Sequence, residues 1–367
     1  MIITPSYKPA YVYGGPTFSI SKHAEVLNQF IDLQIITTTA NGENELDVKT
    51  GVNTKVDNVN VIYFNRQTKD HSHFSFGLLK YLWNNCKEYD VVQIQSWWNL
   101  ISIFSALICV LKKCKTIVSP RGMLSDYTIQ NSKYKIIVNK IFRRVLYKRF
   151  YFHLTSQYEL SQTNKLNARF NYLIPNFLLS GDNINTPTEE KQGILYLSRI
   201  DKKKNIESLI KSMEFISSQV QLNIAGKADQ TYLAYLKKII PYNSIDRVNW
   251  LGQIYGEEKN KIIAKSRLLV LPSFDENFAN IVLESLLNGT AVVISKNVGL
   301  ADFIEKYNLG WVLEQNDKLE DIINRALLDE VKLNFINNNA KEIVLREFND
   351  EKLLKQYLEM YNSILNN

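Results

Sequence analysis

Cysteine and histidine are scarce in this chain of 367 residues, which has three cysteines and four histidines. Cys86, Cys109 and Cys114 are too few and too irregularly spaced for a disulfide framework or a zinc site. His71 and His73 are two positions apart, a spacing more typical of a polar loop than of a metal-ligand pair. The sequence therefore predicts no metal site, and we expect the protein to reside in a reducing cytoplasm.

Long apolar runs are also missing. The longest, at 100–111, is well short of the ~20 residues that a membrane-spanning helix needs, so it predicts a core helix. The chain opens on a short apolar strand that runs at once into Pro5, so we expect no signal peptide. With 45% hydrophobic and 22% charged residues, the composition is typical of soluble globular proteins, and the length suits two domains.

Acidic residues are sparse in the first half of the chain. Residues 1–180 contain 21 Lys and Arg against 11 Asp and Glu, whereas the remainder contains 23 against 26. The net charge of +7 therefore comes from the first half. An acidic partner is expected there: a membrane surface, a phosphorylated substrate or nucleic acid.

Short apolar strands alternate with helical patterns in two successive series. This alternation predicts an α/β fold with two doubly wound, largely parallel sheets, and ligands bind such sheets at the carboxyl ends of the strands. We expect a first Rossmann-like domain at 1–178, a polar linker at 179–192 and a second Rossmann-like domain at 193–349. The segment 350–367 has an amphipathic pattern that extends to Leu365 and predicts a final helix.

The segment SRIDKKKN follows one predicted strand of the second domain. It places Arg199 at the end of the strand and Lys204 one loop further on. A guanidinium fork together with an ammonium suits a diphosphate. A solvated run of charges at 202–204 is an equally good interpretation of the pattern alone.

Two glutamates flank a predicted helix start in PSFDENFANIVLES. If the helix begins near Ala279 or Asn280, its first amides favour a phosphate or a polar sugar edge. Glu276 then precedes the helix and Glu284 lies about one turn inside it, so the pair could hold a sugar and a ribose diol. By spacing alone, the simpler interpretation is a glutamate that favours the helix dipole and a second glutamate at the surface.

Gly14 and Gly15 join the first predicted strand to the first helix. Glycines let the backbone approach a ligand closely, although an ordinary flexible turn explains a lone pair equally well. The spacing matches neither the dinucleotide fingerprint nor the P-loop, so it supports neither NAD nor ATP binding.

Taken together, SRIDKKKN, LNIAGKAD, VNWLGQI and PSFDENFANIVLESLLNGTAVV resemble the nucleotide-sugar-binding half of the retaining glycosyltransferases of family 4. The stretches YGGP and VSPRGML resemble the first half of the same family. The resemblance implies the GT-B fold, in which two Rossmann-like domains face a cleft and the C-terminal helix packs back toward the first domain.

The resemblance also implies residue roles. Arg199 and Lys204 would hold the donor diphosphate and Glu276 the transferred sugar, which makes these three the implied catalytic residues. Glu284 would bind the ribose, the backbone of Ile254 the base, and Gly15 the phosphate. The implied donor-binding set is Gly15, Arg199, Lys204, Ile254, Glu276, Asn277, Phe278, Ala279, Asn280 and Glu284.

Acceptor binding is implied for Gly14 and Arg121. The chain departs from the family pattern at Arg121, which lies where many members have a histidine in the first domain. Ala279 likewise replaces a common glycine.

The implied function is transfer of a sugar from a nucleotide-sugar donor, UDP-sugar favoured over GDP-sugar, to a lipid-linked or saccharide acceptor in bacterial surface polysaccharide (O-antigen or capsule) biosynthesis. No cofactor is expected and no Asp-x-Asp occurs, which is consistent with catalysis without a metal. An epimerase acting on nucleotide sugars is the alternative. A binding protein that uses the basic half on nucleic acid ranks last, because no nucleic-acid motif accompanies the charge.

A basic amphipathic helix is predicted within 132–152, which carries seven basic residues and no acidic one. Lys133, Lys140, Arg144 and Lys148 fall along one face, beside an apolar stripe that includes Ile141. Such a helix suits an anionic membrane surface, so we expect a cytoplasmic protein that is peripheral on the inner face of the membrane. The alternative is an ordinary helix whose apolar stripe packs on the sheet.

Overall fold

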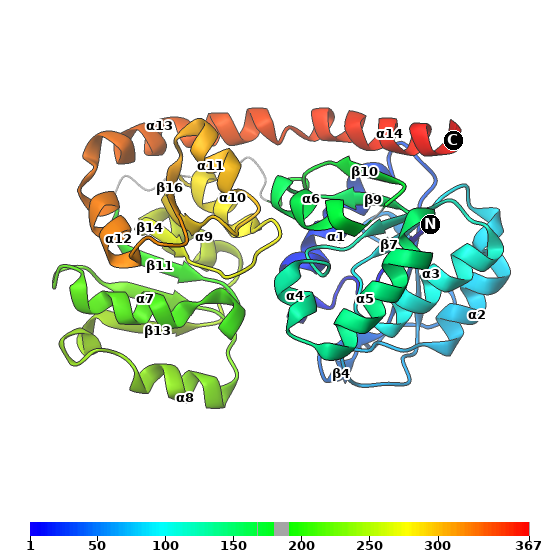
Figure 1. Cartoon of the computed structure of the whole chain (residues 1–367), viewed down its shortest axis with the longest axis horizontal. Helices are drawn as coiled ribbons and strands as arrows, with labels where there is room; N and C mark the ends of the chain where they lie inside the picture. The colour runs from blue at the N-terminus through cyan, green and yellow to red at the C-terminus, as the bar shows by residue number, and fades with distance from the viewer. Residues whose placement is uncertain (167, 180–190, 367) are drawn as a thin grey trace. The chain divides into compact units, whose positions relative to one another are not determined.

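The computed structural model describes residues 1–166, 168–179 and 191–366. The chain divides into two compact units, one formed by Met1–Leu179 with Phe348–Asn367 and the other by Ser180–Glu347 (Figure 1). The expected linker, 179–192, lies almost wholly outside the described residues. Each unit is built around its own sheet.

The first unit contains an eight-stranded sheet in the order β10-β9-β8-β7-β1-β2-β6-β5. All neighbours pair in parallel except the edge strand β5, which is antiparallel to β6. A small hairpin of β3 (Ala40–Asn41) and β4 (Asn44–Glu45) follows β2. The strands of the main sheet are β1 (Ile2–Ile3), β2 (Gln34–Thr38), β5 (Asn53–Val56), β6 (Val59–Phe64), β7 (Val92–Gln95), β8 (Thr116–Ser119), β9 (Tyr151–Leu154) and β10 (Phe170–Leu173).

Helices cover both faces of this sheet. Val92, Ile94 and Val118 face the apolar core shared with α2 and α3. The alternate positions face the other way, because successive strand residues point to opposite sides. There Gln93 accepts a hydrogen bond from Tyr361 of α14, over 2.6 Å. The helices of this unit are α1 (Gly15–Leu27), α2 (Phe76–Asn85), α3 (Leu100–Lys112), α4 (Asp126–Gln130), α5 (Lys133–Val145), α6 (Gln157–Thr163) and α14 (Asp350–Asn366).

The C-terminal helix α14 packs on the first unit, as predicted. Its Tyr357 hydroxyl lies 3.1 Å from Nε2 of the buried His153 on β9. The predicted apolar face is wrong at its end, because Leu365 is 42% exposed and the buried stripe runs through Met360 and Ile364 instead. The 3.6-residue period brings those two, rather than Leu365, onto the side of Tyr357.

The second unit contains a six-stranded, wholly parallel sheet in the order β13-β12-β11-β14-β15-β16. Numbered within the unit, this order is 3-2-1-4-5-6, that of the dinucleotide-binding Rossmann fold, with the switch point between β11 and β14. The strands are β11 (Gln192–Leu197), β12 (Leu222–Ala225), β13 (Val248–Gly252), β14 (Ser266–Leu271), β15 (Ala291–Ser295) and β16 (Gly310–Leu313).

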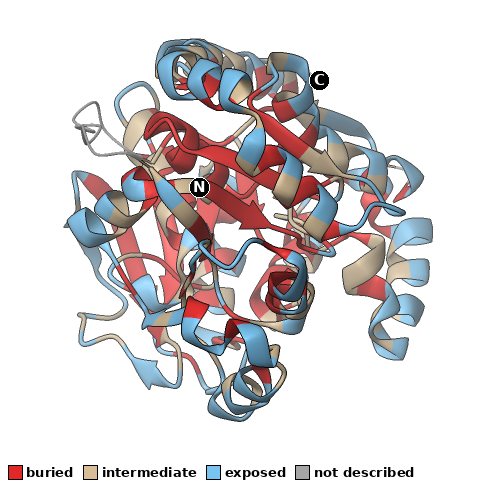
Figure 2. Cartoon of the chain, turned by 90° about the vertical axis from the view of Figure 1, so that its left-hand side faces the viewer, coloured by how far each residue is buried: buried red, intermediate tan, exposed pale blue. Residues whose placement is uncertain are grey.

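Central strands of the second unit are buried on both faces, as parallel sheets require. Every residue of β15 is buried, as are the last four of β14. Figure 2 shows these strands in red, with helices around them whose outer surfaces are exposed. The helices are α7 (Ile206–Ser212), α8 (Gln230–Lys238), α9 (Gly256–Lys265), α10 (Asn280–Leu287), α11 (Ala301–Tyr307), α12 (Leu319–Leu328) and α13 (Glu330–Glu347). No helix within the described part of the chain is both long and apolar enough to cross a membrane.

Candidate functional site

The predicted donor-binding residues of the second unit gather at the switch point of its sheet. Arg199 and Lys204 follow β11, and Glu276 follows β14, the neighbouring strand in the sheet. The two strands are parallel, so both loops emerge at the same edge. This is the edge at which open α/β sheets bind their ligands.

Lys204 and Glu276 form an ion pair between these two loops. Their side chains are 11% and 20% exposed, so the pair is largely shielded from water. A second ion pair lies beside it, with Lys203 Nζ 2.6 Å from Oδ2 of the buried Asp275. The Phe274 amide also donates to the Lys203 carbonyl over 2.9 Å. Three contacts thus fix one loop against the other, which the sequence did not reveal.

Lys204 lies in the short 3-10 helix η5 (Lys202–Lys204) and is buried. Burial lowers the pKa of its ammonium to about 7, while the carboxylates of Asp201 and Asp275 oppose this shift. The interpretation of 202–204 as a merely solvated run of charges is wrong for Lys204. The buried ammonium is suited to hold an anion at this edge, because it has little water to lose on binding.

The backbone of Glu276 is held from the opposite side by the segment that follows β15. Its amide donates to the Asn297 carbonyl over 3.0 Å, and its carbonyl accepts from the Gly299 amide over 2.8 Å. A short parallel bridge to Val298 results. The carboxylate therefore projects from a fixed backbone rather than from a loose loop.

Helix α10 begins at Asn280, directly after this loop, as predicted. Its N-cap Ala279 adopts a left-handed conformation, with φ at 65°, and supplies no side-chain cap. The left-handed conformation is about 1 kcal/mol less favourable for a residue with a Cβ than for glycine. A glycine would therefore also suit this position. Phe278 and Ala279 are buried, whereas Asn277 and Asn280 are partly exposed. The amides at the start of α10 provide a partial positive charge at the same sheet edge as Lys204.

Arg199 does not join the Lys204–Glu276 pair. Its side chain is 71% exposed, and its Nε lies 2.8 Å from the Asp201 carboxylate. Two residues of one loop thus pair with each other. The guanidinium keeps most of its surface in solvent, where it remains accessible to a ligand.

Glu284 lies inside α10 and is only 7% exposed, so its interpretation as a surface glutamate is wrong. Its carboxylate forms an ion pair of 2.7 Å with Lys259 of α9. Sequence reasoning missed Lys259, which lies 25 positions upstream in a charged helix with no distinctive motif. Ile254 precedes the same helix, just beyond the left-handed Gly252 at the end of β13, and its side chain is buried. Burial of this side chain fixes the position of the adjacent backbone.

In the first unit, Gly14 and Gly15 form the start of α1. Gly14 is the N-cap, with φ at 63° and ψ at −131°, a conformation essentially restricted to glycine. Pro16 follows within the first turn, where its fixed φ suits a helix. An ordinary flexible turn is therefore the poorer interpretation, because Gly14 and Pro16 each suit the backbone conformation of their position.

Arg121 follows β8 in a left-handed conformation, with φ at 55°. Its Nε donates to the Gln95 side chain over 2.9 Å, and Nη1 donates to Asn176. The neighbouring Gly122 amide donates to the buried Glu159 carboxylate over 2.6 Å. Nε and Nη1 are thus held within the unit, whereas Nη2 is buried and has no hydrogen-bond partner among the described residues.

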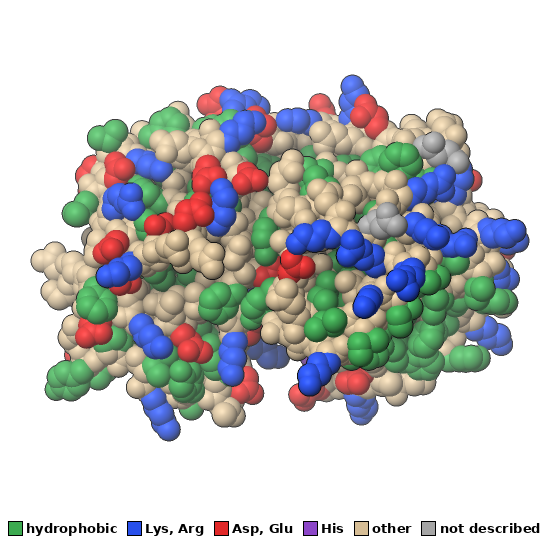
Figure 3. All heavy atoms as spheres, viewed as in Figure 1, with side chains coloured by type: hydrophobic (Ala, Val, Ile, Leu, Met, Phe, Trp, Pro, Cys, Tyr) green, Lys and Arg blue, Asp and Glu red, His purple; other side chains and the backbone are tan. Residues whose placement is uncertain are grey.

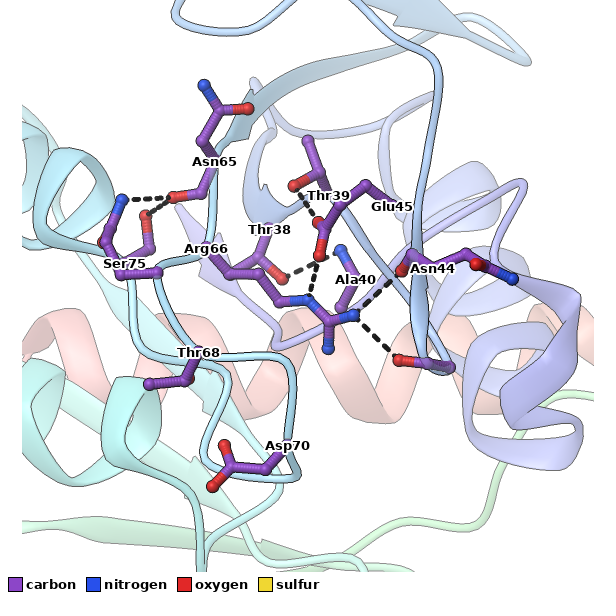
Figure 4. Close-up of polar contacts among 12 residues, drawn as sticks. Thr38, Thr39, Ala40, Asn44, Glu45, Asn65, Arg66, Thr68, Asp70 and Ser75 are labelled. Atoms are coloured by element: carbon purple, nitrogen blue, oxygen red, sulfur yellow. Dashed lines mark hydrogen bonds and ion pairs between the residues drawn. The ribbon is translucent and has the colours of Figure 1, made fainter.

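A further polar cluster lies at the carboxyl ends of β2 and β6, where Arg66 holds the β3–β4 hairpin (Figure 4). Its Nε donates to the Glu45 carboxylate over 2.6 Å. Its Nη2 donates to the carbonyls of Gly42 and Asn44, each over 2.8 Å. The hairpin is therefore a fixed part of this edge, which the sequence did not predict.

Metal-ligating side chains do not converge at either sheet edge. Within 1–166, 168–179 and 191–366, no group of three or more His, Cys, Asp or Glu residues is placed to hold a metal ion. The ring centroids of His71 and His73 lie 6.5 Å apart, with the rings tilted at 58°, in the loop after β6. A loop is the position that their spacing predicts.

Comparison with known proteins agrees with the motifs. Residues 182–343 match the family model described as glycosyl transferases group 1. An uncharacterised glycosyltransferase of Methanocaldococcus jannaschii is 30% identical over 178 residues, 47% of this chain and 45% of that protein. The N,N′-diacetylbacillosaminyl-diphospho-undecaprenol α-1,3-N-acetylgalactosaminyltransferase of Campylobacter jejuni is 23% identical over 186 residues, 50% of this chain and 48% of that protein. The chain spans about half the length of these curated relatives.

Among solved structures, the HepE protein of Anabaena in complex with UDP-glucose matches with a TM-score of 0.74 at 19% identity. The match covers 99% of this chain and 98% of that one. At this identity the likeness concerns the fold, and it confirms the predicted GT-B class of two Rossmann-like units. Residues 182–343 are therefore similar to the group 1 glycosyltransferases, the broader family that the sequence motifs indicate.

Proposed function

We propose that this protein is a retaining glycosyltransferase that moves a sugar from a nucleotide-sugar donor, with a UDP-sugar favoured, to a lipid-linked or saccharide acceptor. The observation that supports this most strongly is the Lys204–Glu276 pair at the switch point of a Rossmann-like sheet, beside the start of α10. A cation, a carboxylate and helix amides meet there, as binding of a sugar diphosphate requires.

Departure of the nucleotide builds negative charge on its diphosphate and positive charge at the anomeric carbon. Lys204, Arg199 and the first amides of α10 would stabilise the leaving group electrostatically. Glu276 would position the transferred sugar by accepting hydrogen bonds from its hydroxyls, so that the acceptor attacks in the correct geometry. Front-face attack needs no enzyme nucleophile and gives retention.

The donor's nucleoside would extend along α10 and α9. Glu284 would accept hydrogen bonds from the ribose hydroxyls, and the backbone at Ile254 would face the base. In the first unit, Gly15 would approach the phosphate, while Gly14 and Arg121 would serve the acceptor. The HepE complex with UDP-glucose is consistent with a uridine nucleotide, and the Campylobacter relative's name describes a lipid-diphosphate acceptor.

The acceptor class would place the enzyme at a membrane during surface polysaccharide assembly, and α5 supplies a surface that fits. No residue of this helix is buried. Its stripe of Tyr134, Ile137, Ile141 and Val145 is 53–63% exposed. In Figure 3, hydrophobic atoms lie next to Lys and Arg over this region. Exposed apolar side chains beside a basic row favour an anionic lipid surface over simple packing on the sheet.

The proposal is tested by incubating the protein with UDP-, GDP- and ADP-sugars and following donor cleavage and transfer. We expect turnover with one UDP-sugar, unchanged by EDTA, and product with the anomeric configuration of the donor. Interconversion of a UDP-sugar without acceptor would instead indicate the epimerase, which neither the matched family nor the reported relatives support. Inverted product or loss of turnover in EDTA would contradict the retaining or metal-independent part.

A further inference from the structure

The three cysteines of the chain converge at the amino edge of the first unit's sheet, although the sequence gives no sign of it. Cys86 opens the 3-10 helix η2 (Cys86–Glu88), Cys109 lies near the end of α3, and Cys114 precedes β8 by two residues. Cys86 and Cys109 are buried, whereas Cys114 is partly exposed. The Cys114 thiol lies 3.8 Å from the Cys86 carbonyl.

The way α3 ends brings Cys109 and Cys114 together. Lys113 adopts a left-handed conformation, with φ at 59°. The Lys113 amide donates to Val110, and the Cys114 amide donates to the Cys109 carbonyl over 2.9 Å. These are the two hydrogen bonds of a Schellman motif, in which the side chains of the two outermost residues characteristically touch. Here both of those residues are cysteines, and each thiol shifts the pKa of the other.

The surroundings favour a thiolate at the exposed sulfur. The Cys109 thiol, then the Cys86 thiol and the ammonium groups of Lys87 and Lys112, lower the pKa of Cys114 to about 6. Burial raises the pKa of Cys86 to about 11, and the hydrogen bond to Cys114 raises the pKa of Cys109 well above its usual value. One reactive thiolate therefore has two neutral thiols beside it, the arrangement of redox-sensitive cysteines that have a resolving partner.

We propose that Cys114 is a peroxide-reactive cysteine and that Cys109 resolves its oxidised form into an intramolecular disulfide. The Cys114 thiolate attacks one oxygen of hydrogen peroxide, the O–O bond breaks, and the departing hydroxide takes a proton from solvent to become water. Cys114 is then a sulfenic acid. The Cys109 thiol attacks that sulfur, loses its proton, and displaces the hydroxyl group as a second water. Two thiols are oxidised and one peroxide is reduced.

This site is independent of the proposed transferase chemistry. It lies where β7 and β8 begin, whereas the candidate substrate-binding residues of this unit, Gly14, Gly15 and Arg121, follow the carboxyl ends of β1 and β8. The other candidate donor residues belong to the second unit. The disulfide would join the last turn of α3 to the residues that lead into β8. An experiment that contradicts the cysteine proposal would leave the proposed sugar transfer unaffected.

The wild-type protein tests the proposal by peptide mapping. Cleavage after glutamate yields one peptide, 89–159, that holds both Cys109 and Cys114, and another, 46–88, that holds Cys86. After brief exposure to hydrogen peroxide, we expect peptide 89–159 to lose two hydrogens and to resist alkylation. Before oxidation, iodoacetamide at pH 7 should alkylate Cys114 at least tenfold faster than either other cysteine.

Three serine variants sharpen the result. Cys109→Ser should stop at the sulfenic acid, trapped as a dimedone adduct on Cys114, whereas Cys114→Ser should not react with peroxide at the same dose. Cys86→Ser, the matched control, should still form the disulfide. The proposal is overturned if peptides 46–88 and 89–159 become cross-linked, or if Cys114 of the folded wild type reacts no faster than Cys86.

Discussion

Lys204 and Glu276 neutralise each other across the switch point of the second sheet. One follows the first strand of the unit and the other follows the fourth, so the pair exists only because β11 and β14 are neighbours. A donor diphosphate would compete with Glu276 for the ammonium, and the sugar hydroxyls would compete with Lys204 for the carboxylate. In this proposal, the pair holds both groups in place until the substrate replaces it.

Glu276→Gln should lower kcat by about 100-fold or more, because the amide positions the sugar less well and offers no negative charge to the developing cation. The amide retains the size of the side chain and can still accept a hydrogen bond from Lys204, so the melting temperature should change little. Steady-state transfer assays and thermal melts measure both effects.

Glu342→Gln provides the matched control for this substitution, since Glu342 is an exposed glutamate of α13. It should leave kcat unchanged. If Glu276→Gln keeps at least half of the wild-type kcat, Glu276 does not position the transferred sugar.

Donor affinity should fall as the pH rises above 7. The pKa of Lys204 is lowered to about 7 by burial, so the free protein loses this positive charge above that pH. A bound diphosphate stabilises the ammonium and raises its pKa, so binding takes up a proton and weakens by up to about tenfold per pH unit. Titration calorimetry with UDP at pH 7, 8 and 9, in buffers of different ionisation enthalpy, measures affinity and proton uptake together.

Lys204→Met removes the titrating group and should bind UDP weakly at every pH, without proton uptake. Lys202→Met, two positions away on an exposed side chain, should retain the wild-type profile. Equal wild-type affinity at pH 7 and pH 9 would show that Lys204 does not contact the diphosphate in its charged form.

Much of the fold could be predicted from the sequence, because buried parallel strands are short apolar runs with helices between them. The alternation indicates both sheets, and the motif predicts that α10 begins near Ala279 or Asn280, where the structure has it begin at Asn280. The β3–β4 hairpin escaped notice because its strands have two residues each and its stability comes from Arg66, 21 positions beyond Glu45.

The candidate site was predictable only in part, for a related reason. The family resemblance indicates Lys204, Glu276 and Glu284, but the side chains that neutralise them depend on which helices and loops pack together. Lys259 lies in a charged helix that resembles any solvated surface, and its contact with Glu284 follows from the packing of α9 against α10. The convergence of the three cysteines is likewise a property of the packing of α2, α3 and β8.

Glu284 should discriminate between ribose and dideoxyribose. If its carboxylate accepts hydrogen bonds from both hydroxyls, the wild type should bind UDP about 10- to 100-fold more tightly than 2′,3′-dideoxy-UDP, because the dideoxy ligand cannot donate these two hydrogen bonds. Glu284→Ala should bind the two nucleotides equally. Equilibrium binding of both ligands to both proteins measures the coupling between the Glu284 side chain and the ribose hydroxyls.

Lys259 provides a second check on this pair. Lys259→Met leaves Glu284 without its ion-pair partner and should lower the melting temperature, because a buried charge is uncompensated. The Glu284→Ala/Lys259→Met double variant should recover part of that loss. Undiminished discrimination by Glu284→Ala would place the ribose elsewhere.

Membrane binding through α5 should depend on charge and on apolar contact at once. The predicted basic face is wrong at Lys148, because α5 ends at Val145 and Lys148 lies in the 3-10 turn Tyr147–Arg149 that follows. Neutralising Lys140, Arg144 and Lys148 to Gln removes three cations, each worth about 1 kcal/mol near an anionic surface, so binding should weaken by roughly two orders of magnitude. Ile137→Ser with Ile141→Ser should weaken it as well, because both side chains are more than half exposed and would insert between headgroups. Flotation with vesicles of phosphatidylglycerol and phosphatidylcholine measures the bound fraction.

A matched set of changes in the other unit separates a specific surface from general basicity. Lys237, Lys238 and Lys261 are exposed lysines of α8 and α9, and converting them to Gln removes the same charge. This control should float like the wild type, whereas equal loss from both triple variants would mean that only net charge attracts the lipid. Because α5 exposes its apolar stripe in the absence of any partner, the isoleucine variant should also be at least as stable as the wild type; a clear drop in its melting temperature would indicate that the stripe packs within the protein instead.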